Sequence, residues 1–132
     1  MDECIFCKIV RKDIPSAVVY EDDAFYAFLD ISPQSHGHTL VIPKQHVRWV
    51  WDIDDAQGFC AVVQKVAKAL QVAEETDWIT SATIGDEVHH AHIHLIPRHH
   101  TDGKKGFFAS ENIESLDGDA MQALAKHIRT SF

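Results

Sequence analysis

Three histidines at two-residue spacing are the residues of this chain best suited to chemistry. His90, His92 and His94 alternate with apolar residues in the stretch 88–98. A period of two is typical of a β-strand, which would place the imidazoles in a row on one face and apolar side chains on the other. Each buried ring nitrogen then needs a donor, an acceptor, a metal ion or a substrate, because unpaired polar groups are costly to bury. The row therefore predicts a chemical site, and a hydrogen-bonded polar strip is the simpler alternative.

A pair of cysteines near the N-terminus, Cys4 and Cys7, has the spacing of a zinc or redox site. A thioredoxin-type redox site normally follows a strand, and too few residues precede Cys4 to form one. Two thiolates bind tetrahedral zinc when the chain supplies two more ligands, which His46 and one histidine of the row can provide. We therefore predict a structural zinc ion, with a free thiol pair packed at an N-terminal turn as the alternative.

Hydrophobic periodicity indicates the elements that must position these residues. Runs of β-branched and aromatic residues bounded by turn residues predict strands. The predicted strands cover residues 18–21, 24–29, 38–43, 77–84 and 88–98. Hairpins of such strands with segregated helices indicate an α+β domain built on an antiparallel sheet.

One long helix is predicted between the third and fourth strands. Apolar residues recur at helical spacing as far as Ala73, and Asp54 or Asp55 is placed to cap the N-terminus. Cys60 falls on or near the apolar side, so we expect a core thiol without a chemical role. The remaining segments are a short helix or turn, a loop and a C-terminal helix, over residues 4–11, 99–112 and 117–129.

Composition and charge exclude several classes of function. The chain has 132 residues, of which 45% are hydrophobic and 24% charged, which predicts one compact domain over residues 1–132. Its net charge of −8 disfavours binding to nucleic acid or to an anionic membrane surface. No apolar run has the length of a membrane span, the N-terminus begins acidic, and three cysteines are an odd number. We expect a cytoplasmic protein without disulfides.

The stretch His90–Ile96 resembles the His-x-His-x-His-x-x signature of the histidine triad (HIT) family, in which the x positions are hydrophobic. The Cys pair points to the zinc-containing bacterial-type branch of nucleotide hydrolases and transferases. Other segments are similar to the N-terminal half of family members in order and spacing, namely 4–9, 14–16, 20–23, 27–33 and 37–46. Together these segments cover most of residues 4–98.

The resemblance implies a five-stranded antiparallel sheet with one long helix and a short C-terminal helix, assembled as a homodimer. It also implies activity on nucleoside phosphoramidates or dinucleoside polyphosphates, and hence a purine nucleotide substrate. By position in the motif, His92 would be the nucleophile and His94 would assist at the phosphate. His38 and the backbone near the row would orient the rings.

The same resemblance assigns two further groups of residues. The ribose hydroxyls would bind Asp30, and the base would contact Phe6, Phe28, Leu29 and Ile31. The zinc ligands, in members with the Cys pair, would be Cys4, Cys7, His46 and His90, which leaves His92 and His94 for substrate.

The chemistry is consistent with these roles. A neutral imidazole is a good nucleophile near neutral pH, and its attack on an α-phosphorus divides a slow hydrolysis into the formation and hydrolysis of a nucleotidyl-imidazole. The hydrogen-bond partner of His92 decides which of its nitrogens is available. Backbone amides and a protonated His94 would neutralise charge that develops on the phosphoryl oxygens.

Two departures from the family pattern concern the leaving-group side. The turn before the histidine strand usually carries Gly-Gln-Ser or Gly-Gln-Thr and is Gly85-Asp86-Glu87 here, and Ile79 replaces an asparagine on the fourth strand. An ionised carboxylate near a phosphate repels it, so we expect slow turnover. If Glu87 is protonated, it becomes a general acid for the leaving group.

Three classes of function remain open. The main hypothesis is a nucleotide hydrolase or transferase, and its rival is a zinc-stabilised nucleotide-binding or interaction protein with little turnover. A metalloenzyme that uses all three histidines of the row as ligands is the more distant alternative.

Overall fold

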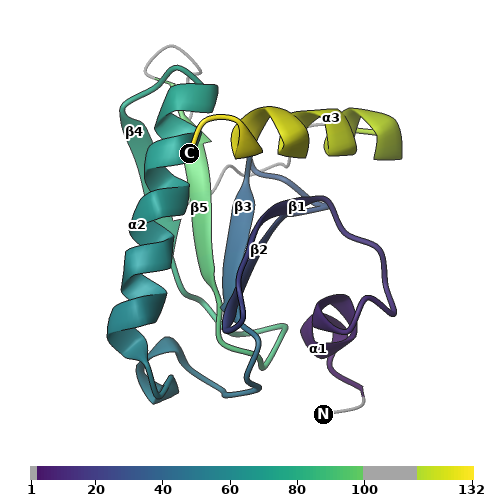
Figure 1. The fold of residues 1–132 in the computed structure, drawn as a ribbon, viewed down its shortest axis with the longest axis vertical. Helices are drawn as coiled ribbons and strands as arrows, with labels where there is room; N and C mark the ends of the chain where they lie inside the picture. Colours follow the sequence, from purple (N-terminus) through teal and green to yellow (C-terminus); the bar gives the residue numbers. More distant parts are fainter. Residues whose placement is uncertain (1–2, 100–115) are drawn as a thin grey trace.

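The computed structural model describes residues 3–99 and 116–132, which form one mixed α+β layer structure (Figure 1). A five-stranded antiparallel sheet has the order β1-β2-β3-β5-β4. The strands are β1 (Val18–Glu21), β2 (Phe25–Leu29), β3 (Thr39–Pro43), β4 (Trp78–Ala82) and β5 (Ile93–Arg98). The helices are α1 (Ile5–Val10), α2 (Ala56–Ala73) and α3 (Gly118–Arg129), with a 3-10 turn η1 at Val50–Asp52. The predicted fold class is confirmed.

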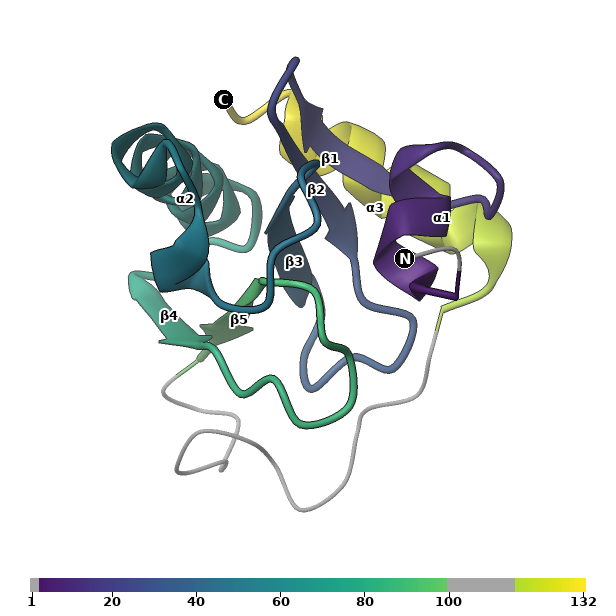
Figure 2. The same ribbon diagram turned by 90° about the horizontal axis from the view of Figure 1, so that it is seen from below.

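The sheet separates two hydrophobic clusters. On one face, α2 and α3 cover the main core, where they lie in front of the strands in Figure 1. Alternation along β2 divides its side chains, with Ala27 and Leu29 in the main core and Tyr26 and Phe28 on the other face. Helix α1 packs its Phe6 on that other face. Figure 2 shows that α1 stands well apart from α2.

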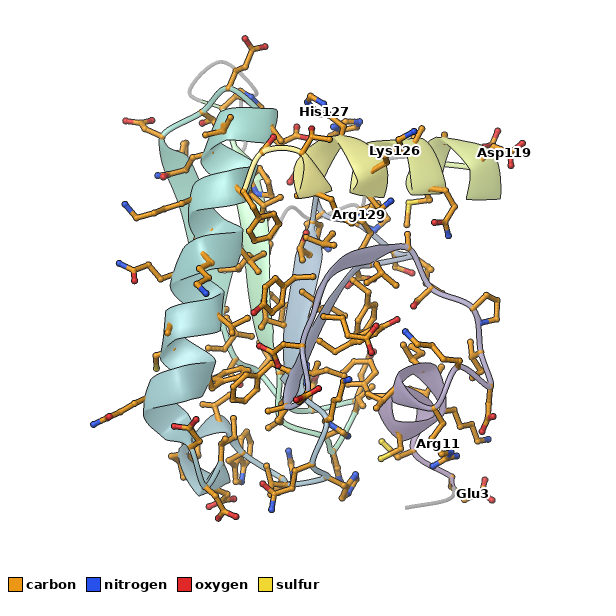
Figure 3. The ribbon with its side chains drawn as sticks, viewed as in Figure 1. Glu3, Arg11, Asp119, Lys126, His127 and Arg129 are labelled. Atoms are coloured by element: carbon orange, nitrogen blue, oxygen red, sulfur yellow. The ribbon has the colours of Figure 1, made fainter. Side chains whose placement is uncertain are left out.

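The helices begin at the residue types that cap N-termini. The carboxylate of Asp55 accepts a hydrogen bond from the Gly58 amide at the start of α2, as predicted for this position. Asp117 caps α3 in the same way through the Ala120 amide. Near the end of α3, Arg129 reaches β1 and donates to the Val18 carbonyl (Figure 3). The caps satisfy amides within the helices, and the Arg129 bond ties α3 to the sheet.

Three sequence predictions need correction or lie outside the structure. The histidine strand was expected over 88–98, but β5 begins at Ile93. The ladder to β3 ends there because the preceding Ala91 amide donates instead to the Val47 carbonyl, at 2.8 Å. Cys60 is exposed rather than in the core. The loop predicted at 99–112 lies outside the described residues, apart from its first residue.

Among residues 3–99 and 116–132, no helix combines the length and apolar character needed to cross a bilayer.

Candidate active site and metal centre

The predicted row of imidazoles exists, although β5 contains only one of them. Ala91 and Leu95 point into the main core, and the three histidines project to the opposite side of the sheet. His90 is fully buried, and His92 exposes 6% of its surface. The alternation of the sequence therefore survives beyond the end of the strand, and it delivers the histidines to two different clusters.

The first cluster contains two thiols and two imidazoles. The Sγ atom of Cys4 lies 3.5 Å from Nδ1 of His90, and that of Cys7 lies 3.5 Å from Nδ1 of His90 and 3.3 Å from Nδ1 of His46. All four candidate ligand atoms fall within 4.8 Å of one another. Helix α1 holds the sulfurs, since Cys4 is its N-cap and accepts a hydrogen bond from the Cys7 amide.

Backbone contacts orient His90 for metal binding. Its Nε2 lies 2.8 Å from the carbonyl oxygen of Pro43, which can only accept, so Nε2 carries the proton and Nδ1 presents a lone pair to the thiols. Burial lowers the pKa of His90 and, without a cation, raises the pKa of the Cys7 thiol. Two sulfurs and two neutral imidazole nitrogens are the ligand set of a closed tetrahedral zinc site. The four predicted metal ligands are therefore brought together.

His92 lies beside this cluster, and its hydrogen bond leaves the other ring nitrogen available. The Nδ1 atom is 2.7 Å from the His90 carbonyl oxygen, which fixes the proton on Nδ1 and the lone pair on Nε2. The ring packs edge-on against Phe6, with the centroids 5.2 Å apart. The His90 carbonyl and Phe6 thus hold the ring in an orientation that leaves the Nε2 lone pair of the neutral form available to a nucleophilic role.

The second cluster is a chain of hydrogen bonds through His38 and His94. The Gln34 amide donates to Nδ1 of His38 at 3.0 Å, so the proton of that ring is on Nε2. This Nε2 lies 3.0 Å from Nδ1 of His94, which must accept. The proton of His94 is therefore on Nε2, and one backbone amide sets the tautomers of both rings.

Burial keeps both rings of this chain neutral. Desolvation lowers the pKa of His38 to about 4. Burial, together with the neighbouring His38 and His92, lowers the pKa of His94 to about 4. Asp30 lies at the edge, with Oδ2 3.6 Å from Nε2 of His38, and burial raises the pKa of its carboxyl group. The hydrogen-bonded pair His38 and His94, called the relay below, therefore carries no net positive charge at neutral pH. The expectation that a protonated His94 neutralises phosphoryl charge is wrong.

The residues predicted to surround a base are not all at this site. Phe6 and Phe28 contact each other edge-on at 5.5 Å on the histidine side of the sheet. Ile31 is 77% exposed next to Asp30. Leu29 is only 2% exposed and faces the main core, on the opposite side of the sheet from His94, so the structure does not place it where a base could touch it.

The departures on the leaving-group side are partly resolved. Ile79 packs against the main core and pairs with Pro97, so it faces away from His94, whose partner on β4 is Ala82. The expectation that Ile79 faces the phosphate is therefore wrong. Asp86 and Glu87 are both exposed. The negative charge of Asp86 acts to raise the pKa of His94, but this effect is smaller than the lowering by burial.

The expectation that the backbone near the row orients the rings did not specify the main-chain groups that decide the tautomers. The Gln34 amide and the carbonyls of Pro43 and His90 carry no side-chain signal. Only the turn composition of residues 30–37 indicated that a loop approaches His38.

Comparison with known proteins connects this geometry to a family. The model of the HIT domain matches residues 11–101. The adenosine 5'-monophosphoramidase of Saccharomyces cerevisiae is 36% identical over 128 residues, covering 95% of this chain and 80% of the relative. The purine nucleoside phosphoramidase of Escherichia coli K12 is 40% identical over 103 residues, covering 72% of this chain and 87% of the relative.

Solved structures are also similar over nearly the whole chain. A Hit-like protein from Bartonella henselae has a TM-score of 0.83 and 36% identity, with 100% of this chain and 98% of that chain covered. A zinc-bound histidine triad protein from Mycobacterium smegmatis has a TM-score of 0.81 and 31% identity, with coverage of 98% and 93%.

Proposed function

The chain belongs to the histidine triad (HIT) family, and we propose that it is a nucleotide hydrolase or transferase of the zinc-containing bacterial-type branch. It would cleave at the α-phosphate of nucleoside phosphoramidates or dinucleoside polyphosphates. The observation that carries this proposal is the hydrogen bond from Nδ1 of His92 to the His90 carbonyl, which leaves Nε2 available for nucleophilic attack in a buried site. Two relatives named as phosphoramidases support this reaction class.

The reaction would proceed in two displacements. In the first, the Nε2 lone pair of His92 forms a bond to the α-phosphorus while the phosphorus–nitrogen bond breaks, and the leaving amine takes up a proton. In the second, water attacks the nucleotidyl-histidine, the P–Nε2 bond breaks and the nucleoside monophosphate leaves. For a dinucleoside polyphosphate, a phosphorus–oxygen bond would break in the first step.

The relay would supply a neutral donor to the phosphoryl group. Because His94 carries its proton on Nε2, it can donate to a phosphoryl oxygen without first being charged. His38 would act through His94 as a positioning residue. Glu87, which is exposed, remains a proposed general acid for the leaving group when it is protonated.

The nucleoside would bind beside the relay. Asp30 would accept hydrogen bonds from ribose hydroxyls. Its position supports this role, because Oδ2 lies 3.6 Å from Nε2 of His38 and the Ser32 amide holds Oδ1. The edge-on pair Phe6 and Phe28, with the exposed Ile31, offers apolar surface for a purine. Leu29 has no part in this proposal.

The metal of the first cluster would be structural zinc, bound by Cys4, Cys7, His46 and His90. Its chemistry would be confined to holding α1 and the N-terminal turn against the histidine segment. The zinc-bound relative from Mycobacterium smegmatis supports this choice of ion.

We further propose a homodimer that works in the cytoplasm. Strand β4 is an edge strand, paired only with β5 among the described strands, and an open edge favours pairing with a second copy. Two closely spaced cysteines kept as metal ligands suit a reducing compartment. Sedimentation at micromolar concentration should give twice 14.9 kDa, and a mass of 14.9 kDa would contradict the dimer.

The test of the function is a turnover screen with adenosine phosphoramidate and diadenosine polyphosphates, followed by mass spectrometry of quenched reactions. We expect a nucleotidyl adduct on His92. The His92→Asn variant should still bind nucleotide but form no adduct, with turnover reduced by about 10³-fold or more, as when other covalent nucleophiles are removed. Unchanged hydrolysis by this variant would overturn the mechanism, and nucleotide binding without any turnover by the wild type would favour a binding protein.

A further inference from the structure

A buried carboxylate at the end of α2 has no role in the site described so far. Glu74 is the C-cap of this helix, and only 7% of its side chain is exposed. A helix C-terminus carries partial negative charge, so it is an unfavourable place for an anion, and burial adds to the cost. The carboxylate of Glu74 therefore does not stabilise the helix, and we look for its role in the groups that the carboxylate contacts.

The contact is with the loop that precedes His38. Both carboxylate oxygens of Glu74 lie close to Nδ1 of His36, at 2.9 and 3.0 Å. Carboxylate oxygens can only accept, so the His36 nitrogen donates. The side chain of Glu74 also lies against Gly37, where a Cβ atom would be 3.0 Å from Oε2. Gly37 has φ +89°, a conformation that favours glycine, so the backbone and the carboxylate are fitted to each other.

This loop delivers the amide that orders the relay. Gln34, two residues before His36, donates to Nδ1 of His38 and so fixes the proton of that ring on Nε2. Within the loop, the His38 amide donates to the Ser35 carbonyl at 3.1 Å. The His36–Glu74 contact joins the loop to the end of α2, on the opposite face of the sheet from His94.

We infer that His36 and Glu74 are a positioning pair, which anchors the loop to α2 and thereby holds the Gln34 amide on His38 and the proton of His94 on Nε2. This inference rests on the proposed function for its effect on turnover, but its effect on the tautomers is independent of any substrate. Loss of the His36–Glu74 contact would let the Gln34 amide shift away from Nδ1 of His38. Both tautomers of His38 and His94 would then become accessible.

The experiment compares zinc-loaded wild type with Glu74→Ala, Glu74→Gln and His36→Ala. The primary readout is the nitrogen-15 chemical shifts of the His38 and His94 rings without nucleotide, which distinguish the two neutral tautomers. We expect single Nε2–H forms in the wild type and mixed signals in both alanine variants. Glu74→Gln keeps an oxygen acceptor for His36 and should retain the wild-type signals.

Turnover of adenosine phosphoramidate is the second readout. The alanine variants should lose about tenfold in kcat, because contacts behind functional imidazoles have effects of this order, whereas KM should change by less than about twofold since no nucleotide contact is removed. Glu75→Gln is the matched control, because Glu75 is the adjacent exposed carboxylate, and it should behave as wild type.

The outcomes separate the two proposals. Wild-type tautomers together with wild-type kcat in both alanine variants would overturn the positioning role. If Glu74→Ala does not fold, His36→Ala removes the same contact from the half-exposed partner and decides the question. Failure of the wild type to turn over any nucleotide would refute the proposed function, while the ring signals would still confirm or refute the positioning pair.

Discussion

The two histidine clusters of this protein are built from similar residues yet favour opposite chemistry. Each gathers two imidazoles with thiol or carboxylate side chains so that the candidate ligand atoms lie within 4.8 Å of one another. One cluster contains Cys4, Cys7, His46 and His90, and the other contains Asp30, His38 and His94. The difference lies in the backbone group behind a ring. A carbonyl of Pro43 accepts from His90, whereas an amide of Gln34 donates to His38.

This difference decides where the protons go. At His90, the Pro43 carbonyl accepts from Nε2, so the N–H points away from the cluster. The Nδ1 lone pair and the thiols then face a common point that suits a cation. Behind His38, the donor forces the N–H toward His94, and a proton occupies the space between the two rings. A metal ion bound between the rings would displace the proton from Nε2 of His38. The proton could not move to Nδ1 of the same ring, because the Gln34 amide donates to that atom. Two clusters that each contain two imidazoles thus suit different roles. The proton positions make the first suitable for a metal ion and the second suitable for a proton relay.

The largest expected effect comes from removing a ligand of the first cluster. Cys7→Ser should lose the zinc ion and lower the free energy of unfolding by on the order of 5 kcal/mol, since metal binding and folding are coupled in such sites. Elemental analysis and urea unfolding measure both quantities. Cys60→Ser, at an exposed thiol, is the matched control and should change neither. Full zinc retention in Cys7→Ser would remove the metal site from the comparison.

Acid should destabilise the relay. His38 and His94 have pKa values of about 4 in the folded protein, below the ordinary value of 6.5, so the unfolded chain binds more protons between these limits. Stability from this source is therefore complete above pH 6.5 and is lost as the pH falls toward 4, by roughly 3 kcal/mol per histidine at most. Unfolding at fixed zinc measures this loss. His38→Gln should show a shallower decline, and an equal decline would contradict the assignment.

Turnover should separate the clusters more finely. His38→Gln removes the ring that orders His94 and should lower kcat by about 10- to 100-fold, or roughly 1.4 to 3 kcal/mol of transition-state stabilisation. The variant should retain one zinc ion per chain, because no ligand of the first cluster is changed. Steady-state kinetics and elemental analysis on the same preparation test both statements, and loss of zinc would show that the clusters are not independent.

The smallest expected effect is the response to excess zinc. Protein that already carries one ion should bind no second equivalent at the relay, because the Gln34 amide opposes protonation of Nδ1 on His38 when Nε2 binds a metal. Calorimetric titration with zinc should therefore show only weak heats, and the unfolding midpoint should not change. A tight second site lost in Asp30→Asn would contradict the distinction between the clusters.

The amino-acid sequence predicted the fold class, the long helix with a cap at Asp54 or Asp55, and the side of the sheet to which the histidines project. It also predicted zinc ligands at Cys4, Cys7, His46 and one histidine of the row, which the family resemblance identified as His90. These features depend on local periodicity and on side-chain chemistry, both of which are written along the chain. The family resemblance added roles for His92, His94 and His38, which remain proposals.

Tertiary contacts were needed to show where β5 begins and which ring nitrogen carries each proton. They were also needed to show that Leu29 and Ile79 face the main core and that Cys60 is exposed. The backbone groups that made several of these decisions are distant in sequence, as with Pro43 and His90, which are 47 residues apart. Every residue has the same backbone carbonyl, and every residue except proline has the same amide N–H. The residue type therefore does not indicate which backbone group will contact a histidine. The path of the chain in space therefore decides whether an imidazole becomes a metal ligand, a nucleophile or a proton relay.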